Sequence, residues 1–318
     1  MIAEYGACRL CPNLCEVDRS RSKGFCGCSD VCTIAFSGLH RGEEPPLCGA
    51  KGSGMVFFTG CPLRCQTCQN MQISRPGFNA APSYDEDQLS QLFIDLQEQG
   101  AATLNLVTGT QFIPTIRLAL VKAKAMGLKL PVVWNSSGYE SIEAIKTIDS
   151  LIDLYLLDVK TIDRDVAKAF CRTERYVDVI KPLMDYLTSA SPRTVVRPGR
   201  IKGILVRHLV FPGTTDASLR FLKWFAEQGY KDSCYLSLMV QFVSPDPSKS
   251  YPDISKADYE RLSDALEALG IDNGFVQEYG DPSTRDERLW LPDFYRENPF
   301  APGFADILPS FKARRSSL

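Results

Sequence analysis

Three cysteines stand close together in the stretch MVFFTGCPLRCQTCQN, residues 55–70, where an apolar run ends. Cys61, Cys65 and Cys68 are separated by three and then two residues. Three thiolates at this spacing can bind three irons of a [4Fe-4S] cluster and leave the fourth iron without a protein ligand. A structural zinc ion would instead take four protein ligands, usually as two CxxC-like pairs. The missing fourth cysteine therefore favours a cluster that is open to a small molecule.

Most other cysteines precede this loop. The chain has 12 cysteines among 318 residues, and ten of them fall within the first 68 residues. Because disulfides rarely persist in a reducing cytoplasm, metal binding explains this excess better than disulfide bonding. One group has metal-ligand spacing: Cys8, Cys11, Cys15 and Cys26. Four thiolates suit either a zinc ion or a second iron–sulfur cluster, and the spacing does not choose between them. We expect Cys171 and Cys234 to be small buried apolar side chains.

Composition limits the classes of partner. The chain has 36 basic and 38 acidic residues, a formal net charge of -2, and no block of Lys and Arg that would follow a phosphate backbone. The N-terminus lacks the charged and apolar regions of a signal peptide, and no apolar run approaches the roughly 18 to 20 residues of a membrane span. We therefore expect a cytoplasmic protein that binds neither nucleic acid nor a membrane.

The elements that must position the cysteine loop alternate along the chain from residue 55 onward. Near-continuous apolar runs, typical of strands covered on both faces, occur at 55–60, 102–109, 131–137, 153–159, 204–211 and 235–242. Patterns of helical period lie between them, at 83–100, 114–126, 163–188, 215–228 and 255–270. We expect Ser83 and Glu86 to form a capping box, and the 163–188 segment to break near Thr173.

Six strands alternating with about five helices predict an α/β fold of right-handed βα units. Two architectures fit: a partial (βα)6 barrel and an open doubly wound sheet. In both, the site lies at the carboxyl ends of the strands, where residues 55–60 would deliver the cysteine loop. We predict three regions: a Cys-rich metal-stapled segment at 1–50, the core at 51–280 and a C-terminal extension at 281–318.

The stretch CPLRCQTC has the CxxxCxxC form of the radical S-adenosylmethionine (radical SAM) superfamily, and it resembles that superfamily. Several further stretches resemble the pyruvate formate-lyase activating enzymes and related iron–sulfur proteins: NLVTGTQFIP, VVWNSSGYE, LYLLDVK and ILVRHLVFPG. The resemblance covers most of residues 5–280. It implies a partial (βα)6 barrel, a [4Fe-4S] cluster held by the three loop cysteines, and SAM bound to the open iron.

The same resemblance implies a reaction. Reductive cleavage of SAM would give a 5′-deoxyadenosyl radical, which would abstract hydrogen from a substrate, as in an activating-enzyme-like oxidoreductase. The substrate would be a glycine of a glycyl-radical enzyme or a side chain of another protein or peptide, and flavodoxin or ferredoxin would donate the electron. The competing interpretation is a non-catalytic iron–sulfur or zinc protein, an electron carrier or assembly factor, with a fourth protein ligand near the loop.

By this resemblance, SAM would lie near four strand ends. The residues expected to contact it are Thr108, Thr110, Asn135, Ser137, Asp158, Lys160 and Arg207. Thr108 and Thr110 stand where the superfamily often has a Gly-Gly-Glu stretch, so hydroxyls or backbone carbonyls would replace the glutamate. Thr67 stands where the family usually has an aromatic residue against adenine. The alternatives are a helix cap at 135–137 and an ion pair between Asp158 and Lys160.

Two residues of ILVRHLVFPG receive different roles. Arg207 could neutralise the SAM carboxylate, as a guanidinium binds carboxylates well. Adjacent residues on a strand point to opposite faces, so His208 faces away from Arg207. We expect His208 to be a structural, hydrogen-bonded histidine.

Overall fold

The architecture is a mixed α/β fold built on one curved sheet. The computed structural model describes residues 2–190, 193–246, 248–280, 291–300 and 311–315. Its parallel strands are β2 (Ser53–Phe58), β4 (Leu104–Val107), β5 (Val132–Ser136), β6 (Leu154–Asp158), β8 (Arg200–Leu209), β9 (Tyr235–Met239) and β10 (Asn273–Gln277). They pair side by side in chain order, without reversal. A doubly wound sheet would reverse its strand order, so this is the partial barrel.

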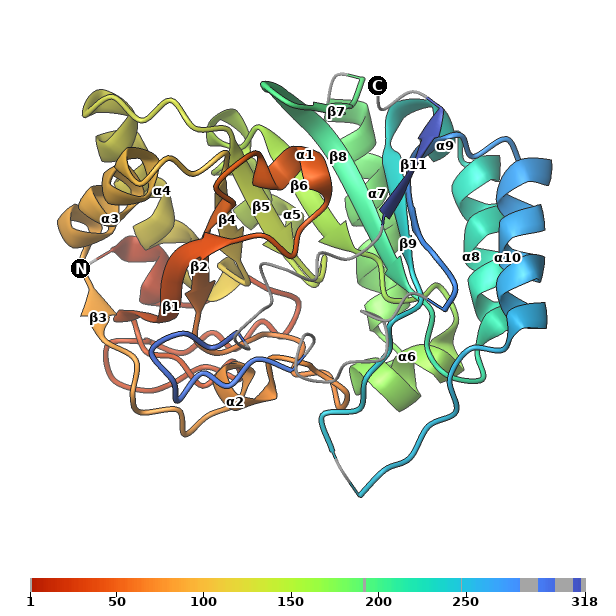
Figure 1. Ribbon diagram of the computed structural model, residues 1–318. Coiled ribbons are helices and arrows are strands. Elements are labelled where there is room, and N and C mark those ends of the chain that lie inside the picture. The colour runs from red at the N-terminus through yellow and green to blue at the C-terminus, as the bar shows by residue number, and fades with distance from the viewer. Residues whose placement is uncertain (1, 191–192, 247, 281–290, 301–310, 316–318) are drawn as a thin grey trace.

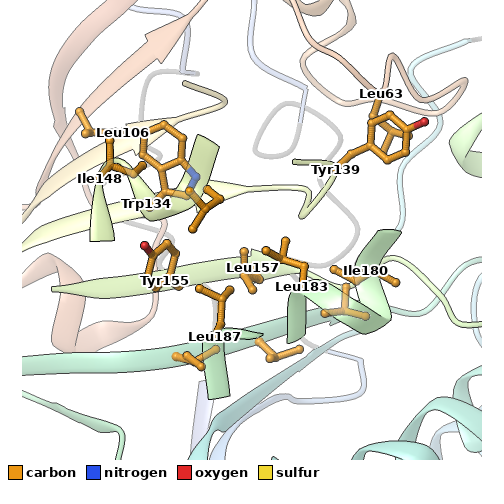
Figure 2. Close-up of a cluster of buried hydrophobic side chains, with 14 of the residues drawn as sticks. Leu63, Leu106, Trp134, Tyr139, Ile148, Tyr155, Leu157, Ile180, Leu183 and Leu187 are labelled. Carbon is orange, nitrogen blue, oxygen red and sulfur yellow. The ribbon is translucent and has the colours of Figure 1, made fainter. Parts of the chain in front are cut away.

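The six predicted strands are confirmed, and β10 was not predicted. Alternate residues of each strand face opposite sides of the sheet, and both sides are buried. Val56, Leu106, Trp134 and Leu157 pack on the outer side in the main core. Figure 2 shows this core, with Trp134 and Tyr155 beside Leu106, Leu157 and Leu187. Burial of these side chains, at about 1.5–3 kcal/mol each, stabilises the helical layer on the sheet.

Helices cover the outer side of the sheet. They are α3 (Glu86–Glu98), α4 (Ile113–Ala125), α5 (Ile142–Lys146), α6 (Arg164–Cys171), α7 (Tyr176–Ala190), α8 (Thr215–Glu227), α9 (Tyr230–Ser233) and α10 (Lys256–Ala268). The helices α3 and α4 lie together over one end of the sheet, and α8 and α10 over the other (Figure 1). Short 3-10 turns are η1 (Ala3–Tyr5), η2 (Thr110–Phe112) and η3 (Asp149–Leu151).

Two expectations about helix ends had different outcomes. The break near Thr173 is confirmed, because α6 ends at Cys171 and α7 begins at Tyr176. The prediction of a capping box at Ser83 and Glu86 is wrong, because the capping box lies two residues later, at Asp85 and Gln88. Asp85 is the N-cap, its carboxylate accepts from the backbone N–H groups of Asp87 and Gln88, and the Gln88 side chain accepts from the Asp85 N–H. Asp is as good an N-cap as Ser, so residue type alone did not fix the first turn.

The N-terminal region takes part in the sheet. β1 (Cys32–His40) pairs antiparallel with β2, and β3 (Ser83–Tyr84) pairs with β1. The short helix α1 (Pro45–Cys48) places Leu47, which is fully buried, against the inner faces of β5, β6 and β8. The sheet therefore crosses the boundary predicted at residue 50, and regular structure begins earlier than the sequence pattern indicated.

Two further strands extend the sheet, and one of them is C-terminal. β7 (Val195–Arg197) pairs antiparallel with β8, and the C-terminal β11 (Phe311–Arg315) pairs antiparallel with β10. The 291–300 segment packs on the inner face of β2, where Phe294 and Phe300 lie 5.4 and 5.9 Å from Phe57 between ring centroids. The Phe294 N–H donates to Gln72 of α2 (Met71–Ser74) at 2.7 Å. The rest of the predicted extension, at 281–290, 301–310 and 316–318, lies outside the described residues.

Candidate functional site

One pocket opens at the carboxyl ends of the parallel strands. Its wall takes residues from β2, β4, β5, β6, β8 and β9 or from the loops that follow them. Predicted site residues that line it are Cys61, Cys65, Cys68, Thr108, Asn135, Ser137, Asp158, Lys160 and Arg207. Since parallel strands end at one edge of the sheet, residues more than 100 positions apart meet here. The sequence prediction of a shared site is consistent with this placement.

The cysteine loop follows β2 directly. Gly60 has a φ of 76°, and a Cβ there would lie 2.2 Å from the Cys28 sulfur, so only glycine fits. The Gly60 N–H donates to the Ile73 carbonyl at 2.7 Å, which fixes the entry to the loop. Burial raises the pKa of Cys61 to about 12, with the charges of Cys65 and Cys68 acting in the same direction. The three thiols line the same pocket wall. They must lose their protons before they can bind a metal centre.

A fourth thiol lies beside this loop. A hydrogen bond with Cys171 is the main reason that the pKa of Cys65 is raised, and burial adds to it. Cys171 ends α6 and is fully buried in the main core, as predicted for a small apolar side chain. The three loop cysteines line the pocket, and Cys171 lies outside its lining. Nothing in the sequence pattern indicates that these two cysteines, more than 100 residues apart, come together.

The ends of β5 and β6 carry polar groups into the pocket. Lys160 Nζ lies 2.7 Å from Asp158 Oδ2, so the predicted ion pair exists at the pocket wall. Burial disfavours the charged lysine, but Asp158 and Cys65 outweigh it and raise the pKa of Lys160. Tyr176 Oη lies 2.8 and 2.9 Å from the carbonyl oxygens of Ser137 and Asp158, and it accepts from the Lys160 N–H at 3.0 Å. Tyr176, which was not predicted, therefore ties these two strand ends together.

Arg207 differs from its expected role. Its guanidinium donates to Glu44 at 2.9 Å through Nε and forms a further hydrogen bond with Glu43. Glu44 is fully buried and the Glu43 side chain is 7% exposed. Burial raises the pKa of Glu43, although Arg207 opposes this rise. Because two buried carboxylates already neutralise Arg207, a third, from SAM, would find little unmatched charge.

Thr110 and His208 are both structural. Thr110 is outside the pocket lining, which departs from our expectation, and its hydroxyl donates to buried Glu140 at 2.8 Å. Glu140 also accepts from Trp134 Nε1 at 2.7 Å. The His208 ring lies between the Val159 carbonyl at 2.9 Å and the Ser218 hydroxyl at 3.0 Å, as expected for a hydrogen-bonded histidine. Burial lowers the pKa of His208 to about 4, so the ring is neutral near pH 7.

The Gln111 side chain, whose role was not predicted from the sequence, contacts the backbone that leads into the cysteine loop. Its amide Nε2 lies within hydrogen-bond distance of three carbonyl oxygens: Thr59 at 2.9 Å, Gly60 at 3.2 Å and Thr108 at 2.6 Å. Thr108 has a φ of 56°, so its turn is held in a conformation rare for a β-branched residue. The stretch NLVTGTQFIP also contains Asn105, Thr108 and Thr110, so the glutamine alone gave no signal of this role.

The pocket has polar groups that fit a bound ligand. Gln69 Nε2 and Gln241 Oε1 are buried and find no partner among the described residues, and both side chains belong to the pocket wall. Buried polar atoms usually bind a partner, so a ligand with acceptor and donor groups suits this wall. Thr67 also lines the pocket, and Phe242 offers an aromatic ring there. Three neighbouring thiols, unmatched amide groups and aromatic rings are compatible with a cluster and SAM.

The chain is similar to several known proteins in sequence or in fold. An uncharacterized protein of Methanocaldococcus jannaschii is 27% identical over 266 residues, which cover 82% of this chain and 73% of that protein. The crystal structure of SuiB from Streptococcus suis superposes with a TM-score of 0.50 and 10% identity, over 73% of this chain and 50% of SuiB. HydG, a maturase of the [FeFe]-hydrogenase, gives a TM-score of 0.48 and 16% identity, over 71% and 52%. The chain thus spans about half of the solved structures that it matches.

The family assignment rests on a match to a family model. The family model of the radical SAM superfamily matches residues 55–225, more than half of the chain, and this range begins in β2 and includes the cysteine loop. In the part of the chain that the structure describes, no helix has both the length and the apolar character needed to cross a bilayer. The chain belongs to the radical SAM superfamily, whose members are enzymes that use a [4Fe-4S] cluster and S-adenosylmethionine.

Proposed function

We propose that the protein is a radical SAM enzyme in which Cys61, Cys65 and Cys68 bind the [4Fe-4S] cluster. The observation that carries this proposal is the position of these three thiols, which line one pocket at the carboxyl ends of the strands. When bound, the reduced cluster and SAM supply one-electron cleavage of the sulfonium to a 5′-deoxyadenosyl radical, which takes a hydrogen atom from the substrate. The chain's residues hold these groups and exclude water.

Each predicted polar residue that lines the pocket has a role in this proposal. Thr108, Asn135 and Ser137 contact SAM through hydroxyl, amide and backbone groups. The Asp158–Lys160 pair, joined at 2.7 Å, presents one acceptor and one donor from the end of β6. Phe242 would stack on the adenine in place of the aromatic residue that Thr67 replaces. Arg207 acts indirectly by holding Glu43 in the wall, because its own charge is already matched.

We propose a protein or peptide substrate, in line with the resemblance to activating enzymes, and a glycine α-carbon as the hydrogen donor. The pocket extends from the cysteine loop to an apolar wall formed by Met55, Phe57 and Phe300. An apolar wall of this kind suits a peptide substrate with small side chains, and it helps to exclude water from the reacting groups.

We also propose that the electron donor is a small acidic carrier, such as flavodoxin or ferredoxin. A hollow outside the cysteine loop is lined by four cations and one carboxylate: Arg64, Arg75, Arg172, Lys249 and Asp246. Arg64 lies within the loop itself, and its guanidinium is 4.6 Å from the centre of the exposed Phe25 ring. A basic surface next to the cluster would attract an acidic donor and orient it.

The test is anaerobic reconstitution with iron and sulfide, followed by reduction with dithionite in the presence of SAM. We expect 5′-deoxyadenosine to form in the wild type and to fall to background in the Cys68→Ala variant. No 5′-deoxyadenosine from a fully loaded, reduced protein would contradict the proposal.

One observation favours a second candidate, a closed cluster in a non-catalytic carrier. Cys171 lies against Cys65 and could supply a fourth ligand. In that case Cys171→Ala would lose the cluster, and SAM would not alter its electron paramagnetic resonance (EPR) spectrum. Our proposal instead requires the Cys171→Ala variant to keep both the cluster and its response to SAM.

A further inference from the structure

Four cysteines of the N-terminal segment come together in a second place. The chain reverses sharply between them, with Leu14 and Glu16 at φ values of 44° and 54°. The Leu14 N–H donates to the Cys11 carbonyl at 3.1 Å, and the Glu16 N–H donates to the Cys8 carbonyl at 3.0 Å. These turns hold Cys8 and Cys11 on one side of the segment. Non-glycine residues with positive φ are uncommon, and they persist where surrounding structure requires the turn.

The other two thiols face the same space. A Cβ at Gly24 would lie 3.6 Å from the Cys26 sulfur and 3.7 Å from the Cys15 sulfur, so both thiols flank this glycine. The Cys8 N–H also donates to the Val17 carbonyl at 3.1 Å, so Cys8 is held against the stretch that follows Cys15. These backbone contacts bring the four cysteines into one small region of the segment.

Hydrogen bonds to sulfur mark these cysteines as acceptors. The Phe25 N–H donates to Cys15 Sγ at 3.2 Å, and Asn13 Nδ2 lies 3.6 Å from Cys11 Sγ. Hydrogen bonds of this kind tune the potential of iron–sulfur clusters by stabilising sulfur charge. These hydrogen bonds therefore suit cysteines that bind a metal centre as thiolates.

A buried cation next to these cysteines lacks a carboxylate partner. Arg19 is fully buried, and among the described residues no Asp or Glu forms an ion pair with it. Its guanidinium donates to the Gln111 and Ser29 carbonyls and lies 4.8 Å from the centre of the Tyr5 ring. An uncompensated buried charge is strongly destabilising, so a negative group should be close by. Thiolates bound to a metal centre would supply that charge, because the Ser29 carbonyl that Arg19 contacts lies only three residues after Cys26.

Two kinds of metal centre suit four thiolates. One is a tetrahedral zinc ion with Zn–S bonds of about 2.3 Å, and the other is a [4Fe-4S] cluster in which each thiolate binds a different iron. Zinc has no redox chemistry, so only the cluster could exchange electrons with the neighbouring radical SAM loop.

The two cysteine sites touch each other. Asn13 Nδ2 donates to the Pro62 carbonyl at 2.7 Å, so one side chain links Cys11 with the residue that follows Cys61. On the other side, Cys28 Sγ donates to the Thr59 carbonyl at 3.4 Å, just before the radical SAM loop. A Cβ placed on Gly60 would lie only 2.8 Å from the Cys26 carbonyl oxygen, so the backbone of the two sites is in close contact here. A short path of bonds and hydrogen bonds therefore joins the two sites.

We propose that Cys8, Cys11, Cys15 and Cys26 hold a second [4Fe-4S] cluster that relays electrons to the cluster of the radical SAM loop. The relay role rests on the proposed function of that loop. A reduced one-electron donor protein is oxidised as the N-terminal cluster gains one electron, and that cluster is reoxidised as the loop cluster gains the same electron. No atoms are transferred, and all four irons of the N-terminal cluster keep a protein thiolate.

The test uses the full-length protein and two variants. The loop variant is Cys61→Ala/Cys65→Ala/Cys68→Ala, and the N-terminal variant is Cys11→Ala/Cys15→Ala. After anaerobic reconstitution we expect about eight irons and eight sulfides per wild-type chain, and about four of each in either variant. In the reduced wild type, EPR should show the broadening of two coupled spins, and each variant should show one isolated signal.

Several outcomes would overturn the inference. These are one zinc and about four irons per wild-type chain, or about four irons with no second signal. Either result is obtained without a mutation, so an unfolded variant cannot hide it. A wild type with about eight irons that makes no 5′-deoxyadenosine would instead contradict the proposed function, and it would leave the second cluster in place.

Discussion

The two cysteine sites differ in their ligand number and in what surrounds them. The radical SAM loop offers three thiols to a pocket with unmatched amide groups, at Gln69 and Gln241. The N-terminal segment offers four thiols inside tight turns, beside a buried guanidinium and with one backbone N–H group on the Cys15 sulfur. A centre with a vacant iron can bind and transform a small molecule, and a centre with every iron ligated can only exchange electrons. In our proposal, the number of thiolate ligands therefore distinguishes the centre that reacts with SAM from the centre that only transfers electrons.

The largest effect should come from the loop variant. Without Cys61, Cys65 and Cys68, SAM cleavage should fall to background, although about half of the iron should remain. Parallel iron analysis and chromatography of 5′-deoxyadenosine measure both quantities. Loss of all the iron together with activity would show that the two sites are not separate.

The N-terminal variant should separate two routes of reduction. With a protein donor, 5′-deoxyadenosine formation should fall roughly tenfold, about 1.4 kcal/mol in activation free energy, because the relay is missing. With dithionite, a small reductant that reaches the loop cluster directly, the rate should stay within about twofold. An equal loss with both reductants would contradict a relay and indicate a structural role.

The Asn13→Ala variant should weaken the link between the sites without removing either cluster. Its amide contacts both Cys11 and Pro62, so we expect a roughly threefold slower transfer, about 0.7 kcal/mol, at unchanged iron content. Rapid-mixing EPR would follow the loop signal, with exposed Asn79→Ala as the matched control. If the transfer rate in Asn13→Ala matched that of the control, the proposed path would be wrong.

Charge reversal on the basic hollow should have a smaller effect. In Arg75→Glu/Lys249→Glu we expect the KM for an acidic donor to rise about threefold, because exposed charges are screened and act mainly on association. Raising the salt concentration should reduce the difference between wild type and variant. A rise that persists at high salt would point to a packing defect instead.

The smallest effect should be that of Cys171→Ala. This thiol is buried beside Cys65, so its loss should lower the free energy of unfolding by about 1 kcal/mol. Thermal unfolding of the reconstituted protein measures this change, and iron content and SAM cleavage should match the wild type. Loss of the loop cluster would make Cys171 a fourth ligand and the loop a closed site.

The sequence predicted the features that depend on local pattern. Apolar runs identified six strands of the sheet, because parallel strands are covered on both faces. The spacing of Cys61, Cys65 and Cys68 gave the loop and its family. Strand β10 was missed because NGFVQ contains Asn, Gly and Gln, which are poor strand formers.

The contacts that hold the sites together could not be predicted. Arg19, Gln111 and Tyr176 act through partners that lie tens of residues away, as in the hydrogen bond from Tyr176 to the Ser137 carbonyl. Arg207 shows the reverse case, since a residue expected to bind SAM is already paired with Glu43 and Glu44. A single sequence shows residue types and spacing, and it does not show which distant groups meet.

The central claim is that the three-thiol site is open to SAM and the four-thiol site is closed. The direct test is SAM titration of both reduced single-cluster variants, followed by EPR. In the N-terminal variant, which keeps Cys61, Cys65 and Cys68, we predict that SAM shifts the signal and that 5′-deoxyadenosine forms. In the loop variant, SAM should leave the signal unchanged. A shift in the loop variant, or none in the N-terminal variant, would contradict the account.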